Sequence, residues 1–192
     1  MSILTDKLPD SVEIKGQNCP IKTDFRTWIR FTQIITESGT ITPSKIAEMF
    51  RLIFPSLPPN FFDAIQSIMK FYKGTEIKEG KGETENRINR VFDYEYDADL
   101  IYSAFLQQYR IDLVAADLHW HQFKALFNSL SDETQLVKVI QYRSVNLSEI
   151  KDKEMKKFYK KMKEAYRLPD NRSEEEKEDD FNNELSRMFE GM

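Results

Sequence analysis

Residues 93–130 constrain the fold more than any other stretch, because they contain both histidines, one of the two tryptophans and a dense run of aromatic residues. Apolar side chains recur there every three to four positions, in two separate stripes. The stripes consist of Ala98, Ile101 and Phe105, and of Trp120, Phe123, Phe127 and Leu130. Such spacing indicates amphipathic helices that each bury one side. We therefore predict two helices at the centre of the core, over residues 97–108 and 117–129.

The composition fits a soluble domain. A chain of 192 residues with 40% hydrophobic side chains can bury a sizeable core as one domain. A net charge of -4 gives no overall attraction to nucleic acid or to an anionic membrane. Cys19 is the single cysteine, which excludes an intrachain disulfide and favours a reducing compartment. The N-terminus lacks a signal-peptide pattern, and no run of 18 apolar residues occurs. We expect a cytoplasmic protein.

Residues 11–21 predict a short β-hairpin. Val12 and Ile14 alternate with polar neighbours, and Gly16 can supply the turn. Two strands alone are marginally stable, so the hairpin must lean on the helices or pair with a strand of another copy. The outer edge is either protected or able to recruit a neighbouring copy.

Five further helices follow from capping residues and apolar stripes. They are predicted to begin at Thr23 or Asp24, at Pro43, at Asn60, at Asp132 and at Ser148. The fold class predicted is mainly α: a compact multi-helix bundle with a short N-terminal β-hairpin and an acidic amphipathic C-terminal tail.

We expect a helical domain over residues 1–168, interrupted by a mobile loop over residues 73–91. The loop contains half of the six glycines and hardly an apolar residue. It is either a plain solvated loop or an insertion that becomes ordered against a partner.

Residues 169–192 are predicted to form an acidic tail with a short amphipathic helix. Its acidic run, residues 173–180, precedes four apolar residues at spacings i, i+4, i+7 and i+8. These candidate partner-binding residues are Phe181, Leu185, Met188 and Phe189. The stripe can dock on its own domain or on another protein.

No constellation of catalytic or metal-binding residues stands out. His119 and His121 would point about 200° apart on a helix, so both could not reach one ion. Asp93, Asp97 and Asp99 stand at a helix start, where the free N–H groups stabilise acidic side chains. The sequence lacks nucleophile, phosphate-loop and dinucleotide motifs. We predict no enzyme activity, no cofactor and no metal.

Residues 151–167 carry eight lysines and arginines against three acidic residues. This face could touch nucleic acid, but its spacing is typical of a solvated helix face. The acidic run that follows could itself cover the lysines. We expect no nucleic-acid partner.

Several phrases, in order, resemble a known family: LPDSVEIKGQNCPIKTDFRTWIRF, FDYEYDADLIYSAFLQQYRIDL, LHWHQFKALFNSL and VIQYRSVNL. The family consists of small proteins of Gram-positive siphophages and prophages, named after gene product fifteen of a Listeria phage. The resemblance covers about residues 8–168. Many members show Trp in place of His121, so the resemblance does not imply a required histidine pair.

The position of such genes between the major tail protein and the tape measure implies a tail assembly chaperone. The implied partners are the tape measure protein, the major tail protein and further copies of the chain. The alternative is a minor tail or connector subunit retained in the virion.

Overall fold

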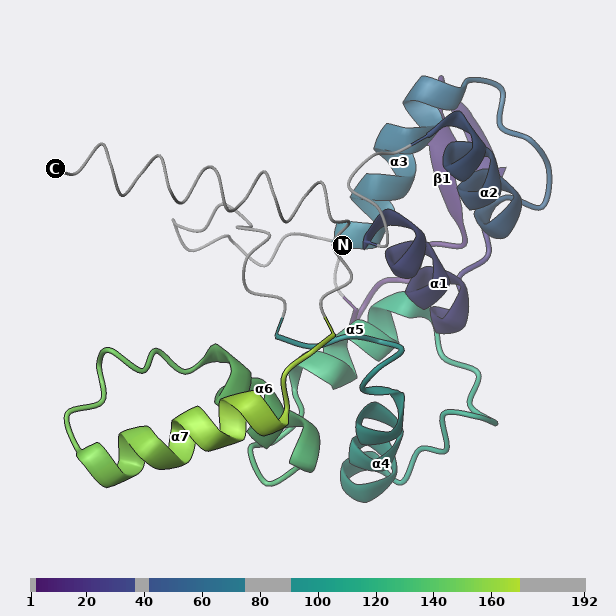
Figure 1. Ribbon diagram of the computed structural model, residues 1–192. Helices are drawn as coiled ribbons and strands as arrows, with labels where there is room; N and C mark the ends of the chain where they lie inside the picture. The colour runs from purple at the N-terminus through teal and green to yellow at the C-terminus, as the bar shows by residue number, and fades with distance from the viewer. Residues whose placement is uncertain (1–2, 37–41, 75–90, 170–192) are drawn as a thin grey trace, which may run out of the picture.

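The computed structural model describes residues 3–36, 42–74 and 91–169, and the fold is mainly α with a two-stranded N-terminal hairpin, as predicted (Figure 1). The elements are β1 (Ser11–Ile14), β2 (Gln17–Pro20), α1 (Phe25–Thr36), α2 (Pro43–Ile53), α3 (Phe61–Lys73), α4 (Ala98–Tyr109), α5 (Trp120–Asn128), α6 (Gln135–Ser144) and α7 (Lys153–Ala165). The hairpin and α1 to α5 form the main body, from which α6 and α7 extend to one side.

The hairpin turns at Lys15 and Gly16, and Gly16 is the turn residue that the sequence predicted. Lys15 and Gly16 have φ angles of 51° and 76°. Positive φ at both central residues is what a tight turn between twisted antiparallel strands requires. Val12 and Ile14 are buried, and the hydroxyl of Ser67 in α3 donates a 2.7 Å hydrogen bond to the Glu13 carbonyl. The hairpin therefore leans on α3.

The outer edge of β2 offers little for pairing with another chain. β1 and β2 are antiparallel with Val12 opposite Cys19 and Ile14 opposite Gln17. Because hydrogen-bonded pairs alternate along such a ladder, Asn18 and Pro20 direct their backbone outward. Proline has no N–H, so this side of β2 presents one free donor. This geometry favours the protected-edge alternative.

Helices α1 to α3 begin where the sequence predicted, directly after Asp24, at Pro43 and directly after Asn60. The Asn60 side chain accepts a 3.0 Å hydrogen bond from the Asp63 N–H, and Thr42 caps α2 just before Pro43. Trp28 of α1 is fully buried. Its indole N–H donates to the Lys22 carbonyl at 2.9 Å, so the buried polar atom is satisfied.

Helices α4 and α5 both bury large apolar residues in the core, as their stripes predicted. Phe123 of α5 stacks on Phe25 with ring centroids 4.8 Å apart and on Phe105 of α4 at 5.1 Å. The Phe123 side chain is fully buried. This ring joins the N-terminal and central helices into one core.

Helix α5 begins at Trp120, and the prediction that it starts at residue 117 was wrong. The Phe25 N–H donates to the Leu118 carbonyl at 3.0 Å, and the Trp120 N–H donates to the Thr23 carbonyl at 2.7 Å. The backbone before α5 is thus paired with the chain entering α1. A long-range pairing of this kind leaves no signal in helical periodicity.

The predicted starts of the last two helices were also wrong. Thr134 caps α6, and Asp152 caps α7 by accepting a 2.7 Å hydrogen bond from the Met155 N–H. The Ser148 hydroxyl instead donates to the Asn146 side chain at 2.8 Å. A local turn thus competes with the cap, as short polar side chains often do.

Two predicted segments lie outside the described residues. They are residues 75–90 of the predicted loop and residues 170–192 of the predicted tail. Helix α3 runs through Lys73, and Gly74 follows it as the C-cap with a φ of 78°.

Candidate partner-binding surfaces

The two histidines lie near each other but serve the fold. His119 precedes α5 as its N-cap, and its Nδ1 accepts a 3.0 Å hydrogen bond from the His121 N–H. Its Nε2 lies 2.9 Å from the Pro9 carbonyl, to which it donates. His121 donates from Nε2 to the Phe71 carbonyl at 2.8 Å and stacks on the Phe71 ring at 4.6 Å. Three of the four ring nitrogens are thus committed.

The expected helical geometry of this pair was wrong, because His119 stands before the helix and the two ring centroids are 5.0 Å apart. The prediction that the two histidines bind no metal ion was based on this geometry. It stays a prediction. Across the described ranges, no group of three or more His, Cys, Asp or Glu side chains is placed to hold a metal ion.

Burial changes the protonation of the groups packed beside Phe71 and Tyr72. It lowers the pKa of His121, and the nearby charges of His119 and Lys124 act in the same direction. Burial also lowers the pKa of Lys124, whose ammonium donates to the Tyr72 and Lys73 carbonyls at 3.0 and 2.8 Å. Lys124 therefore satisfies carbonyls at the C-terminus of α3.

Asp97 and Arg143 form a buried ion pair that sequence reasoning missed. The Arg143 Nη1 and Nη2 atoms lie 2.6 and 2.8 Å from the two carboxylate oxygens of Asp97. The Arg143 side chain is 6% exposed and that of Asp97 is 1% exposed. Arg143 also donates to the Tyr166 carbonyl at 2.6 Å and to the Val91 carbonyl at 3.1 Å. The pair fastens α4, α6 and the chain after α7 together.

Asp97 was expected to stabilise the start of a helix as an acidic residue. It occupies the N-cap position of α4, but its side chain makes no capping hydrogen bond to that helix. It accepts instead from the Asp93 N–H and from Arg143. Asp93 caps the preceding turn through the N–H groups of Glu95 and Tyr96.

One exposed apolar patch lies at the connection between α2 and α3. Leu57, Phe61 and Phe62 are 73%, 54% and 69% exposed. Phe61 also stacks on the buried Phe50 ring at 5.3 Å, which fixes its position. We call these three exposed residues the connector patch. Large exposed apolar side chains that gather in one part of the chain can mark a protein-binding surface.

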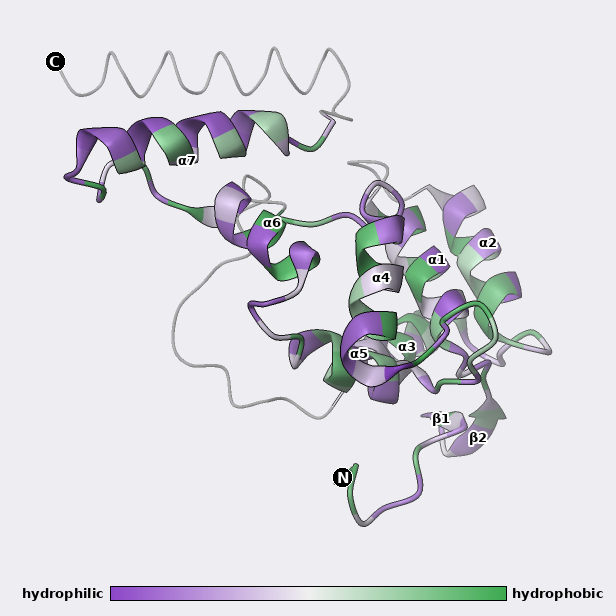
Figure 2. Cartoon of the chain, turned by 90° about the horizontal axis from the view of Figure 1, so that it is seen from below, coloured by the Kyte–Doolittle hydropathy of each residue, from purple (hydrophilic) through white to green (hydrophobic). Residues whose placement is uncertain are grey.

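Helix α7 is the second exposed surface. It has no fully buried residue, and Tyr142 of α6 packs against one side of it through Tyr159 and Tyr166. Met155 and Phe158 remain 54% and 49% exposed. Figure 2 shows that polar residues dominate α7, with apolar positions between them.

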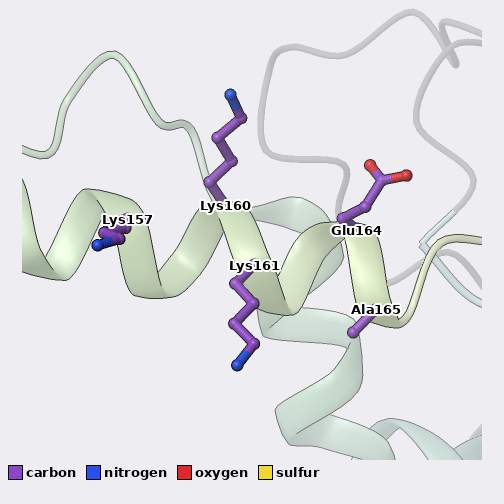
Figure 3. Close-up of a pocket in the computed structure, with 5 residues that line it drawn as sticks. All are labelled: Lys157, Lys160, Lys161, Glu164 and Ala165. Atoms are coloured by element: carbon purple, nitrogen blue, oxygen red, sulfur yellow. The ribbon is translucent and has the colours of Figure 1, made fainter.

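An open hollow on α7 is lined by Lys157, Lys160, Lys161, Glu164 and Ala165. In Figure 3, Lys160 and Lys161 point to opposite sides of the helix, and Glu164 points to the same side as Lys160. The ammonium groups do not converge on one point. The hollow therefore lacks the geometry of a compact anion site.

The comparison with protein families identifies the chain. The family model described as Bacteriophage Gp15 protein matches residues 4–168. The chain belongs to this family. The resemblance inferred from the sequence phrases is thereby confirmed at the level of the Gp15 family. Comparison with curated proteins found no match, and neither did comparison with solved structures.

The family points to a structural or head-tail protein of a phage. For such a protein, the two exposed surfaces described above are the candidate sites of contact with other proteins. Both the connector patch and α7 lie within the matched region. The four candidate partner-binding residues Phe181, Leu185, Met188 and Phe189 lie outside the described residues. None of the helices that the structure describes combines the length and hydropathy needed to cross a bilayer.

Proposed function

We propose that this protein is a tail assembly chaperone that binds the tape measure protein in the host cytoplasm and helps to recruit tail tube subunits. Family membership over residues 4–168 carries the proposal. The proposed partners are the tape measure protein, the major tail protein and further copies of the chain, and no enzymatic step is needed.

The chemistry of such a client suits the exposed surfaces. A tape measure is a long helical chain with apolar stripes, and it would aggregate if it were left uncovered before the tube forms. Leu57 lies in the connection before α3, and Phe62 is exposed in the first turn of α3, next to Phe61, which stacks on Phe50. Both can therefore contact a client helix without repacking of the core. A helix that lies on apolar residues of this kind buries its own stripe.

Many weak contacts along a linear client would suffice for this role. Each copy would contribute a small apolar contact, and repeated copies along one client gain from the raised effective concentration of neighbouring sites. Release when the tube assembles requires that each contact be modest. A small surface such as the connector patch fits this requirement better than a deep pocket.

Co-expression with the tape measure protein tests the proposal. The wild-type protein should keep the tape measure soluble and co-purify with it, and Leu57→Asp/Phe62→Asp should reduce co-purification at least tenfold. Val114→Asp is the matched control, because Val114 is 79% exposed and lies in the loop before α5. A wild-type protein that leaves the tape measure insoluble and unbound would contradict the proposal.

The same preparation tests the contribution of the tail. Truncation after Pro169 should weaken tape-measure binding or change the oligomer mass if Phe181 to Phe189 take part. Unchanged results in both assays would remove the tail from the partner-binding account.

Mass spectrometry of purified virions separates a chaperone from the alternative of a retained minor tail or connector subunit. A chaperone leaves the particle, so its peptides should be absent or far below the abundance of the tail proteins. Stoichiometric retention would favour the structural alternative.

A further inference from the structure

We propose that the lysine face of α7 is the docking surface for the acidic C-terminal segment of the same chain, residues 173–190. The surface is the exposed, positively charged side of α7, and the segment proposed to occupy it follows α7 in the sequence. This contact is independent of the tape measure and does not rest on the proposed function.

The lysines of α7 form no ion pair among the described residues. Helix α7 contains six lysines and two glutamates. Within the described part of the chain, the ion pairs found involve other residues, and Lys163 alone of these lysines makes a hydrogen bond, to the Val145 carbonyl at 3.0 Å. Lysines 157, 160 and 161 thus project a concentrated positive charge into solvent.

The arrangement of these lysines favours an extended polyanion over a single small anion. Lys160 and Lys161 point to opposite sides of α7 (Figure 3), so no one group can contact both closely. Residues 173–180 carry six carboxylates and one lysine in a row. A row of carboxylates that follows one side of the helix can meet Lys157 and Lys161, which lie one turn apart.

The acidic run begins close enough to the end of α7 to fold back along this helix. Arg143 holds the Tyr166 carbonyl at 2.6 Å, so the chain leaves α7 from a fixed point. Glu174 is five residues beyond Pro169, and five residues span at most about 17 Å. Lys161 and Lys157 lie only about 6 and 12 Å back from Ala165 along the helix axis. The acidic run can therefore fold back along α7 without strain.

Exposed apolar residues of α7 add a second kind of contact for the segment. Met155 and Phe158 are half exposed, and they lie toward the N-terminal half of α7. A segment that folds back along α7 brings Phe181 and the apolar residues after it toward this half. Single exposed ion pairs are weak, but tethering raises the local concentration of the partner, and the apolar residues add contact area.

Paramagnetic relaxation measures the contact in the full chain. A spin label is attached to Ser186→Cys in a Cys19→Ser background. At low salt, the amide signals of residues 153–158, in the N-terminal half of α7, should broaden strongly, and at 0.5 M salt the broadening should fall at least threefold. Lys157→Glu/Lys161→Glu should remove it, and adding Glu174→Lys/Glu176→Lys should restore it by exchanging the charges. Lys22→Glu/Lys70→Glu is the control with the same charge change elsewhere, and it should keep the broadening.

Two results overturn the proposal. One is the absence of broadening along α7 at low salt. The other is equally strong broadening when spin-labelled chains without isotope are mixed with isotope-enriched chains without label, because the occupant is then a second copy. Binding of the tape measure does not enter this measurement, so its failure and that of the proposed function are distinguishable.

Discussion

Arg143 contacts three groups, the Asp97 carboxylate and the Val91 and Tyr166 carbonyls, and both members of the ion pair are almost fully buried. We expect Arg143→Ala to lower the free energy of unfolding by about 3 to 5 kcal/mol, because it leaves the Asp97 carboxylate buried without its partner. Chemical denaturation measures this. Arg51→Ala, on the exposed side of α2, is the control and should cost less than about 0.5 kcal/mol.

Removing both charges tests the reason for that loss. The double variant Asp97→Asn/Arg143→Met should be more stable than Arg143→Ala, because it leaves no unpaired buried charge. If Arg143→Ala changed stability by less than about 1 kcal/mol, the ion pair would not fasten the three segments together.

His121 gives the fold a dependence on pH. Its pKa is lowered in the folded protein by burial, so the unfolded chain binds more protons between the folded value and the ordinary value of about 6.5. The contribution of His121 to stability is therefore fully present above about pH 6.5 and is lost as the pH falls through that window. Denaturation at pH 7.5 and 5.5 should show a smaller difference for His121→Gln than for the wild type. An equal difference in both proteins would assign the pH dependence to other groups.

At the scale of elements, α7 depends on Asp152 for its first turn. Asp152→Ala removes the acceptor for the Met155 N–H and should destabilise the helix by about 1 kcal/mol. Hydrogen exchange of the α7 amides should then accelerate about fivefold, because α7 lies at the periphery and can open locally. Ser148→Ala should leave these rates unchanged. The opposite ranking of the two variants would place the cap at Ser148.

At the scale of the whole molecule, the two tryptophans join the N-terminal helices to α5. Their rings are 6.4 Å apart, and Tyr72 lies 5.4 Å from Trp120 and 6.2 Å from Trp28. In a double-mutant cycle, Trp28→Phe and Trp120→Phe should show a coupling energy of about 0.5 to 3 kcal/mol in denaturant unfolding.

The control for this cycle pairs Trp28→Phe with Val139→Ala. Val139 is fully buried in α6 but lies outside the main core cluster. Its effect should add to that of Trp28→Phe within about 0.5 kcal/mol. Additivity in the tryptophan cycle as well would mean that the two parts of the core do not act as one unit.

The sequence by itself determined the helical class, the hairpin turn and most of the buried stripes. Burial of Trp28, Phe105 and Phe123 follows from spacing, since the side of an amphipathic helix that carries the large apolar residues is the side that packs. Gly16 and Asn60 also acted locally, one through its freedom at positive φ and the other by capping α3. Such signals depend on a few neighbouring residues, so the sequence contains them.

Only the tertiary structure decided the contacts between distant segments. The start of α5 depends on backbone pairing with the chain before α1, and Asp97 meets Arg143 across 46 positions. Exposure of Leu57 and Phe62 is likewise a property of how α2 and α3 meet, because their types alone would predict burial. Periodicity records which side of a helix is apolar, but it does not record which partner covers that side.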